Sequence, residues 1–241
     1  MVNSLIISRF NESLNWLEGY QNFNIVIYNK GKNLTNHSFK NIINIDNVGR
    51  ESHTWLYHIV ENYNNLDEVN IFLQGRIDDL NCMSYKDPNK YLKKINKNGF
   101  AVSRLGLLGP FHWSHNVGLD HMPKYAKQWH ENEIRRSKYG FREFAKKLFP
   151  RIPIFVATSY GGCFAVKKEL ILSHSFSFYQ NLLETVSNHK NPVEGHYLER
   201  LWCYMFTKNS LLIDSFKDVI ITKLERSKLI KITEEINTKF Y

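Results

Sequence analysis

The chain has 241 residues, enough for one large α/β domain or two small ones, and no Pro/Gly/Ser-rich linker interrupts it, so we expect a single domain. Its formal net charge of +9 suggests an anionic partner such as nucleic acid, a membrane surface or a nucleotide phosphate, with a merely solvated basic surface as an equal alternative. No segment has the length of a membrane-spanning helix, no signal peptide is recognisable, and three scattered cysteines predict reduced thiols and a cytoplasmic location rather than a disulfide-rich secreted scaffold.

The first third of the chain alternates predicted strands and helices. Strands are expected at 4–8, 24–28, 41–45 and 69–73, with helices after the first and the third. This alternation is typical of a central, mostly parallel sheet flanked by helices on both faces. Ligands bind outside the carboxyl ends of the strands in such sheets, and a polar cluster follows each predicted strand. The clusters are Arg9, Asn11 and Glu12; Asn29 and Lys30; Asn47, Arg50 and Glu51; and Gln74 to Asp79.

The helix after the third strand is amphipathic when its residues are placed at 100° intervals. One arc holds Ser52, Leu56, Ile59, Val60 and Tyr63, and the opposite arc holds Arg50, Glu51, Thr54, His58 and Glu61. Asp46 or Asn47 is expected to cap the helix, and Glu51 lies in the first turn, where the helix dipole favours an anion. We therefore expect one buried face and one solvent-exposed face.

The rest of the chain continues the α/β pattern. Helices are expected at 88–97, 121–135, 140–148, 168–173, 176–187 and 193–206, strands at 99–104, 152–157 and 163–166, and an irregular segment at 107–121. Asn191 is the expected cap of the helix at 193–206, and Glu194 would complete a capping box. Residues 211–241 are a basic tail beyond the main domain of 1–210, expected to pack on that domain, on a partner or on an anionic membrane surface.

Carboxylates supply the strongest candidates for chemistry. Asp78 and Asp79 follow the fourth predicted strand, where they could hold a divalent metal against a diphosphate or simply form a turn. Glu199 falls at the edge of the apolar face of its helix, where a partly buried carboxylate could act as a general base or pair with an arginine. Glu194 is a second candidate base, although its capping position explains it without catalysis.

Glycines and histidines give weaker signals. Gly161 and Gly162 would let the backbone approach a ligand closely, or form a tight turn between two strands. His112 and the neighbouring histidines match no strong zinc spacing, so a contact with a polar ligand is the better interpretation. The sequence contains no recognisable cysteine-nucleophile motif, Walker-A loop or Gly-x-Gly-x-x-Gly pattern.

Over residues 4–206, the chain resembles a family of glycosyltransferase-like proteins found in microbes, fungi and large DNA viruses. The resemblance rests on ordered segments: Ile6-Ile7-Ser8-Arg9-Phe10-Asn11-Glu12 with Trp16-Leu17, Val26-Ile27-Tyr28-Asn29-Lys30-Gly31, Asn47-Val48-Gly49-Arg50-Glu51-Ser52-His53-Thr54, Ile71-Phe72-Leu73-Gln74-Gly75, Tyr160-Gly161-Gly162-Cys163-Phe164-Ala165-Val166 and Glu199-Arg200-Leu201-Trp202. More broadly, these segments are similar to nucleotide-sugar glycosyltransferases with the GT-A fold.

This resemblance implies a GT-A-like fold that binds a nucleotide-sugar donor. The donor would be held by Arg9, Asn11, Glu12, Asn29, Lys30, Asn47, Gly49, Arg50, Gln74, Gly75 and Arg76. The acceptor would lie near Gly161, Gly162 and His112, and Glu199 would be the base of an inverting transfer, with Glu194 as the second candidate. In nucleotide-sugar glycosyltransferases with the GT-A fold, the fourth strand normally ends in Asp-x-Asp, which binds Mn²⁺ or Mg²⁺ on the diphosphate. Here Gln74-Gly75 stands at that place, and Asp78-Asp79 comes later.

We therefore expect a glycosyltransferase that transfers a sugar from a nucleotide-diphosphate sugar to a hydroxyl of a glycan or glycoconjugate. Arg50, Arg76 and Arg104 are candidates to stabilise the departing diphosphate. One alternative is a non-catalytic basic α/β protein that binds nucleic acid or a glycan, although no nucleic-acid motif supports nucleic acid as a partner. The other is a hydrolase that cleaves glycans with a pair of carboxylates.

Overall fold

A six-stranded sheet in the order β3-β2-β1-β4-β8-β5 organises the computed structural model, which describes residues 2–35, 37–77, 85–95, 98–103, 105–108, 113, 116–153, 155–159 and 161–208. The strands β1 (Asn3–Arg9), β2 (Asn24–Asn29), β3 (Asn41–Asn44) and β4 (Val69–Gln74) run parallel. In contrast, β8 (Phe164–Lys167) pairs antiparallel with both β4 and β5 (Phe100–Val102). The expected mostly parallel sheet is therefore corrected to a mixed sheet.

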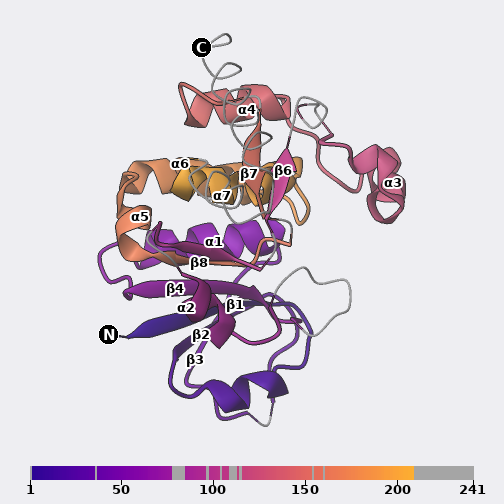
Figure 1. Cartoon of the computed structure of the whole chain (residues 1–241). Coiled ribbons are helices and arrows are strands. Elements are labelled where there is room, and N and C mark those ends of the chain that lie inside the picture. The colour runs from indigo at the N-terminus through magenta and orange to yellow at the C-terminus, as the bar shows by residue number, and fades with distance from the viewer. Residues whose placement is uncertain are drawn as a thin grey trace, which may run out of the picture.

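Helices cover both faces of this sheet, as expected (Figure 1). One face carries α1 (Arg50–Glu61), and α6 (Phe176–Val186) and α7 (Val193–Thr207) pack against α1. The other face carries the 3-10 helix η1 (Asn15–Tyr20) and α2 (Asn89–Lys94). Successive side chains of β1 point to opposite faces of the sheet. Ile6 packs in the core around α1, whereas Leu5 and Ile7 pack in the core around η1.

The helix α1 is buried on two sides rather than on one. Thr54 and His58, which we expected to face solvent, are 0% and 4% exposed. Both bond to the sheet: the Thr54 hydroxyl lies 2.9 Å from that of Ser8, and His58 Nδ1 lies 3.0 Å from the Tyr28 hydroxyl. The expected solvent-exposed arc is thus wrong at these positions, because the sheet covers one side of α1 while α6 and α7 cover the other.

The expected helix caps also differ from the structure. Gly49 precedes α1 in the left-handed region with φ +59°, and neither it nor Asn47 caps the helix through a side chain. α7 begins at Val193 after Pro192, and no side chain caps its start. Glu194 instead forms an ion pair with Arg135, so the predicted capping box is wrong.

The remaining elements surround these layers. A two-stranded sheet pairs β6 (Gly106–Leu108), expected to be irregular, with β7 (Val156–Thr158), which starts later than expected. The further helices are η3 (Leu119–His121), α3 (Pro123–His130), α4 (Phe141–Leu148) and α5 (Lys168–Leu172), and α3 stands to one side of the layers (Figure 1).

Within the described ranges, no helix could cross a membrane. Cys163 and Cys203 are free thiols, as expected, whereas the tail at 211–241 lies outside the described residues.

Candidate active site

A cavity of about 240 Å³ lies at the carboxyl ends of three neighbouring parallel strands. Ser8, Arg9 and Phe10 come from the end of β1, Lys30 follows β2, and Gln74 ends β4. The remaining wall residues are Glu12, Asn47, Arg50 and Glu51. The polar residues that follow successive strands therefore do converge on one hollow, at the position where open α/β sheets bind ligands.

Arg9 and Asn29 shape this cavity mainly by fixing its loops. Arg9 donates to Asn29 Oδ1 at 2.5 Å and to the carbonyl oxygens of Glu12 and Lys32 at 2.9 and 2.8 Å. Asn29 in turn donates to Asn44 Oδ1 at 2.9 Å. Most of the hydrogen-bonding capacity of the Arg9 guanidinium is therefore used by the protein itself.

Asn11, Glu12 and Gly75 also fix the loops of the site. Asn11 Oδ1 accepts a hydrogen bond from the Lys32 amide at 2.9 Å, and Glu12 Oε2 accepts one from the Phe10 amide at 2.7 Å. The Gly75 carbonyl oxygen accepts a bond from the indole of Trp16 at 2.9 Å. Their contacts to neighbouring loops give these residues a structural role beside any contact with a ligand.

Lys30 and Arg50 bring positive charge to the cavity. Lys30 is 9% exposed and donates to the carbonyl oxygens of Val48 and Arg50, and its burial lowers its pKa to about 7. Arg50 Nε lies 3.5 Å from Glu51 Oε2. Glu51 holds the pKa of Arg50 above its ordinary value, with smaller contributions from Tyr125 and Glu199, so Arg50 stays charged. Arg50, together with Lys30 in its protonated form, suits an anionic ligand.

The turn at Gly161 and Gly162 joins the sheet to the helices behind the cavity. The Gly161 carbonyl oxygen accepts a bond from Gln74 Nε2 at 2.8 Å, and its amide donates to Glu199 Oε1 at 2.6 Å. The Gly162 carbonyl oxygen accepts a bond from the Trp55 indole at 2.9 Å. Three predicted site residues, Gln74, Gly161 and Glu199, are thus linked in one chain of hydrogen bonds.

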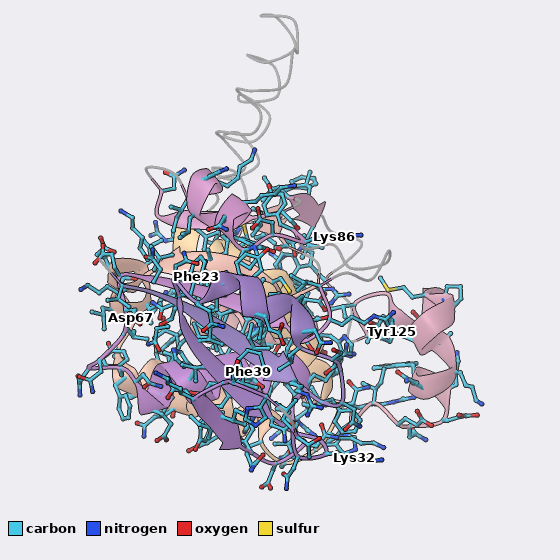
Figure 2. All side chains as sticks on the ribbon, turned by 90° about the horizontal axis from the view of Figure 1, so that it is seen from below. Phe23, Lys32, Phe39, Asp67, Lys86 and Tyr125 are labelled. Carbon is cyan, nitrogen blue, oxygen red and sulfur yellow. The ribbon has the colours of Figure 1, made fainter. Side chains whose placement is uncertain are left out.

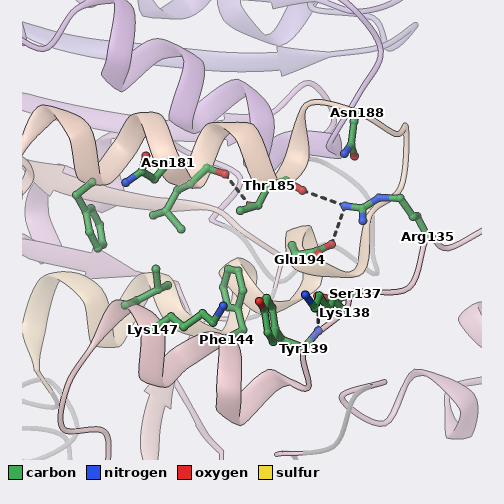
Figure 3. Close-up of a pocket in the computed structure, with 13 residues that line it drawn as sticks. Arg135, Ser137, Lys138, Tyr139, Phe144, Lys147, Asn181, Thr185, Asn188 and Glu194 are labelled. Atoms are coloured by element: carbon green, nitrogen blue, oxygen red, sulfur yellow. Dashed lines mark hydrogen bonds and ion pairs between the residues drawn. The ribbon is translucent and has the colours of Figure 1, made fainter.

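Glu199 and Glu194 occupy different environments on α7. The second oxygen of Glu199 lies 3.6 Å from Arg200 Nη1, which is the arginine pair considered as its structural alternative. Glu194 lies in another hollow of about 460 Å³, where it pairs with Arg135 at 2.9 Å (Figure 3). Arg135 also donates to the Thr185 carbonyl oxygen at 3.0 Å, so Arg135 anchors its loop to α6 through Thr185 and to α7 through Glu194. Glu194 does not line the strand-end cavity.

The other predicted residues are placed only in part. Asn47 lines the cavity, Gly49 forms the left-handed turn before α1, and exposed Arg76 is not part of the cavity wall. Asp78, Asp79, His112 and Arg104 lie outside the described residues.

Comparison with known proteins identifies the family. Residues 5–220 match the family described as "Protein of unknown function (DUF3431)". The chain belongs to the DUF3431 family. No curated protein and no solved structure matches it.

The cavity wall of this DUF3431 member also contains three residues that we had not assigned to the donor, acceptor, catalytic or metal site. Ser8, Phe10 and Glu51 all line the cavity. Glu51 is the most informative of them, because its largely buried carboxylate lies between Arg50 and the turn at Gly162. The sequence places Glu51 in the polar cluster after the third strand and in the first turn of α1, where the helix dipole favours an anion, but we did not include it among the predicted site residues.

Divalent metal binding stays a prediction for this DUF3431 protein. Asp78 and Asp79, the expected ligands of Mn²⁺ or Mg²⁺, are not among the described residues. The part of the chain that the structure does describe contains no group of three or more His, Cys, Asp or Glu side chains placed to hold a metal ion.

Proposed function

We propose that this protein is a glycosyltransferase with a GT-A-like fold, which transfers a sugar from a nucleotide-diphosphate sugar to a hydroxyl of a glycan or glycoconjugate, as in polysaccharide biosynthesis. The observation that supports it most is the cavity at the carboxyl ends of β1, β2 and β4, with Lys30 and Arg50 in its wall. A diphosphate there would lie beside Arg50 and, where it is protonated, Lys30, in a site that is partly shielded from water, where charge interactions are strong.

The proposed reaction is an inverting displacement at the anomeric carbon. The acceptor oxygen forms a bond to that carbon as the bond between carbon and diphosphate oxygen breaks, and a carboxylate takes the acceptor proton. The nucleoside diphosphate leaves with additional negative charge, which Arg50 and protonated Lys30 stabilise. If Asp78 and Asp79 hold Mn²⁺ or Mg²⁺, the ion would neutralise part of the same charge.

Two carboxylates are candidates for the base. Glu51 lines the cavity directly, next to Arg50. Glu199 lies behind the turn and is held by the Gly161 amide and Arg200. We expect Glu51→Gln and Glu199→Gln to separate them: the variant that removes the base keeps donor binding but loses transfer by about 10² to 10⁴-fold. Full activity in both variants would exclude an inverting mechanism based on either residue.

The donor is tested by a thermal-shift screen of UDP-, GDP-, dTDP- and CMP-sugars with and without Mn²⁺. A ligand at about 100 times its Kd stabilises the folded state by about 2.7 kcal/mol, which corresponds to a shift of several degrees. We expect one nucleotide class to give this shift and Arg50→Gln to weaken its binding at least tenfold. The control is Arg151→Gln, because Arg151 is exposed and does not line the cavity. If no nucleotide sugar shifts the wild-type protein, the proposed function is wrong.

A further inference from the structure

A second hollow, of about 360 Å³, adjoins the candidate active site. It shares Asn47 and Arg50 with the strand-end cavity. Its other walls are Tyr125 and Gln128 of α3, together with Glu133, Lys190 and Asn191. The volume falls within the range of about 300–1,000 Å³ that is typical of small-molecule pockets. Arg50 therefore lies in the wall between two adjacent hollows.

The lining of the second hollow suits a ligand rich in hydroxyl groups. Asn47, Gln128 and Asn191 provide amide groups that both donate and accept hydrogen bonds. Glu133 and Lys190 are exposed and add one charge of each sign. No aliphatic side chain lines this hollow within the described part of the chain, so an apolar ligand would find little to bury against.

Tyr125 provides a flat surface in this otherwise polar hollow. Its ring packs edge-on against His196, with 5.4 Å between centroids and an interplanar angle of 76°. The Arg50 guanidinium lies 5.8 Å from the ring centroid, and Asn191 Oδ1 is 3.1 Å from His196 Nε2. Tyr125 lies where α3 faces the rest of the domain (Figure 2) and is only half-buried. Tyr125 thus lines the hollow as a partly exposed residue, and the C–H face of a sugar ring packs well on an aromatic face.

We infer that this hollow is the acceptor subsite, which binds the terminal sugar of a carbohydrate acceptor against Tyr125 and Gln128. The inference rests on the proposed function, because it takes the strand-end cavity as the donor site. An acceptor hydroxyl in the hollow would lie beside Arg50, where the leaving diphosphate and the Glu51 carboxylate also meet. The arrangement supplies both substrates to one point from two sides.

The test uses ligand-observed saturation-transfer NMR on the full chain with trisaccharides of glucose, galactose, mannose and N-acetylglucosamine. We expect at least one trisaccharide to bind, and Tyr125→Ala and Gln128→Ala each to weaken that binding at least fivefold. Lys127→Ala is the matched control on the same helix, because the Lys127 side chain is 79% exposed and does not line the hollow. If no trisaccharide binds, or if both hollow variants bind like the wild type, the inference is overturned. Thermal melts show whether Tyr125→Ala is folded. If it is not, the comparison of Gln128→Ala with the wild type decides the inference.

The nucleotide-sugar screen distinguishes this failure from failure of the proposed function. If nucleotide sugars bind but both variants bind the trisaccharide like the wild type, the glycosyltransferase proposal stands and the acceptor subsite is wrong. If a trisaccharide binds in a way that depends on Tyr125 but no nucleotide sugar binds, the proposed donor site is wrong, whereas the hollow is still a carbohydrate-binding site. The nucleotide that gives the largest thermal shift should leave trisaccharide binding in place, and competition between the two would show that they occupy one site rather than two.

Discussion

The Lys30 ammonium lies at the end of β2, where it is almost fully enclosed. It donates to the carbonyl oxygens of Val48 and Arg50 at 2.6 and 2.5 Å and thereby ties β2 to the start of α1. Burial lowers its pKa to about 7, although the nearby Glu51 carboxylate acts in the opposite direction. A lysine that titrates near neutrality makes the charge of the strand-end cavity depend on pH.

We expect the affinity for a nucleoside diphosphate to fall as the pH rises from 7 to 9. Lys30 is protonated below a pH of about 7 and attracts the diphosphate, and it loses this charge above that pH. Loss of one charge at contact distance should weaken binding about tenfold. Isothermal titration with UDP or GDP, whichever binds, measures the change. Lys30→Met should remove the dependence, whereas Lys32→Met, at an exposed position on the same loop, should keep it. Equal affinity at pH 7 and 9 in the wild type would contradict this role.

At the scale of single residues, the sequence predicts where polar groups gather but not how they are used. The positions of Arg9, Asn29 and Lys30 after two adjacent strands were sufficient to place them together. Their partners are mostly backbone carbonyl oxygens of loops, such as that of Lys32, and loop conformation is not encoded in the strand pattern. Glu51 belongs to the polar cluster predicted after the third strand, but we gave it no role in the site, because its favourable place in the first turn of α1 explained the carboxylate without a ligand.

At the scale of elements, α1 shows the limit of reading amphipathicity from one helix. The angular pattern assigned Thr54 and His58 to solvent because they are polar. In the structure their polar groups find partners in Ser8 and Tyr28, and so they can be buried without an unpaired group. A helix covered on two sides needs hydrogen-bond partners for its buried polar side chains. These partners lie far away in the sequence, so the pattern of the helix alone does not predict them.

The start of α1 also depends on Gly49, and we expect Gly49→Ala to destabilise the protein by more than about 2 kcal/mol. Gly49 has φ +59°, where a Cβ atom costs about 1–2 kcal/mol. That atom would also lie 2.4 Å from the Val186 carbonyl oxygen, so α6 would have to move. Urea unfolding measures the change. The matched control is Gly19→Ala, where an added Cβ meets nothing within 4 Å, and its effect should stay within about 0.5 kcal/mol. Similar stability of both variants would contradict the close approach of α1 and α6.

At the scale of the whole molecule, the class of fold could be predicted and the direction of one strand could not. The alternating strands and helices indicated the parallel strands β1 to β4 and the helices on both faces. The apolar run at 164–166 does not indicate the direction of the strand, because a buried interior strand is apolar on both faces in either direction. Its antiparallel position between β4 and β5 is set by packing across the whole sheet.

The same dense packing buries histidines that resist protonation, and we expect this to limit stability in acid. Burial lowers the pKa of His53 and of His58 to about 4, and burial together with Arg50 and Arg200 lowers that of His196 well below its ordinary value. Between pH 6.5 and 4 the unfolded chain therefore binds protons that the folded protein does not, so the free energy of unfolding falls as the pH falls. Between pH 7 and 5 the loss should be about 2 kcal/mol for His58.

Urea unfolding of the wild type and of His58→Gln at pH 7 and 5 tests this expectation. His58→Gln should be less stable at pH 7, because the Tyr28 hydroxyl loses its imidazole partner, but it should lose about 2 kcal/mol less on acidification. Carboxylates that titrate in acid affect both proteins alike, so the difference between the two pH slopes isolates His58. His130→Gln, at an exposed position on α3, should keep the wild-type slope. If His58→Gln also keeps that slope, His58 takes up its proton in the folded protein as readily as in the unfolded chain, and its enclosure between α1 and the sheet is not maintained in solution.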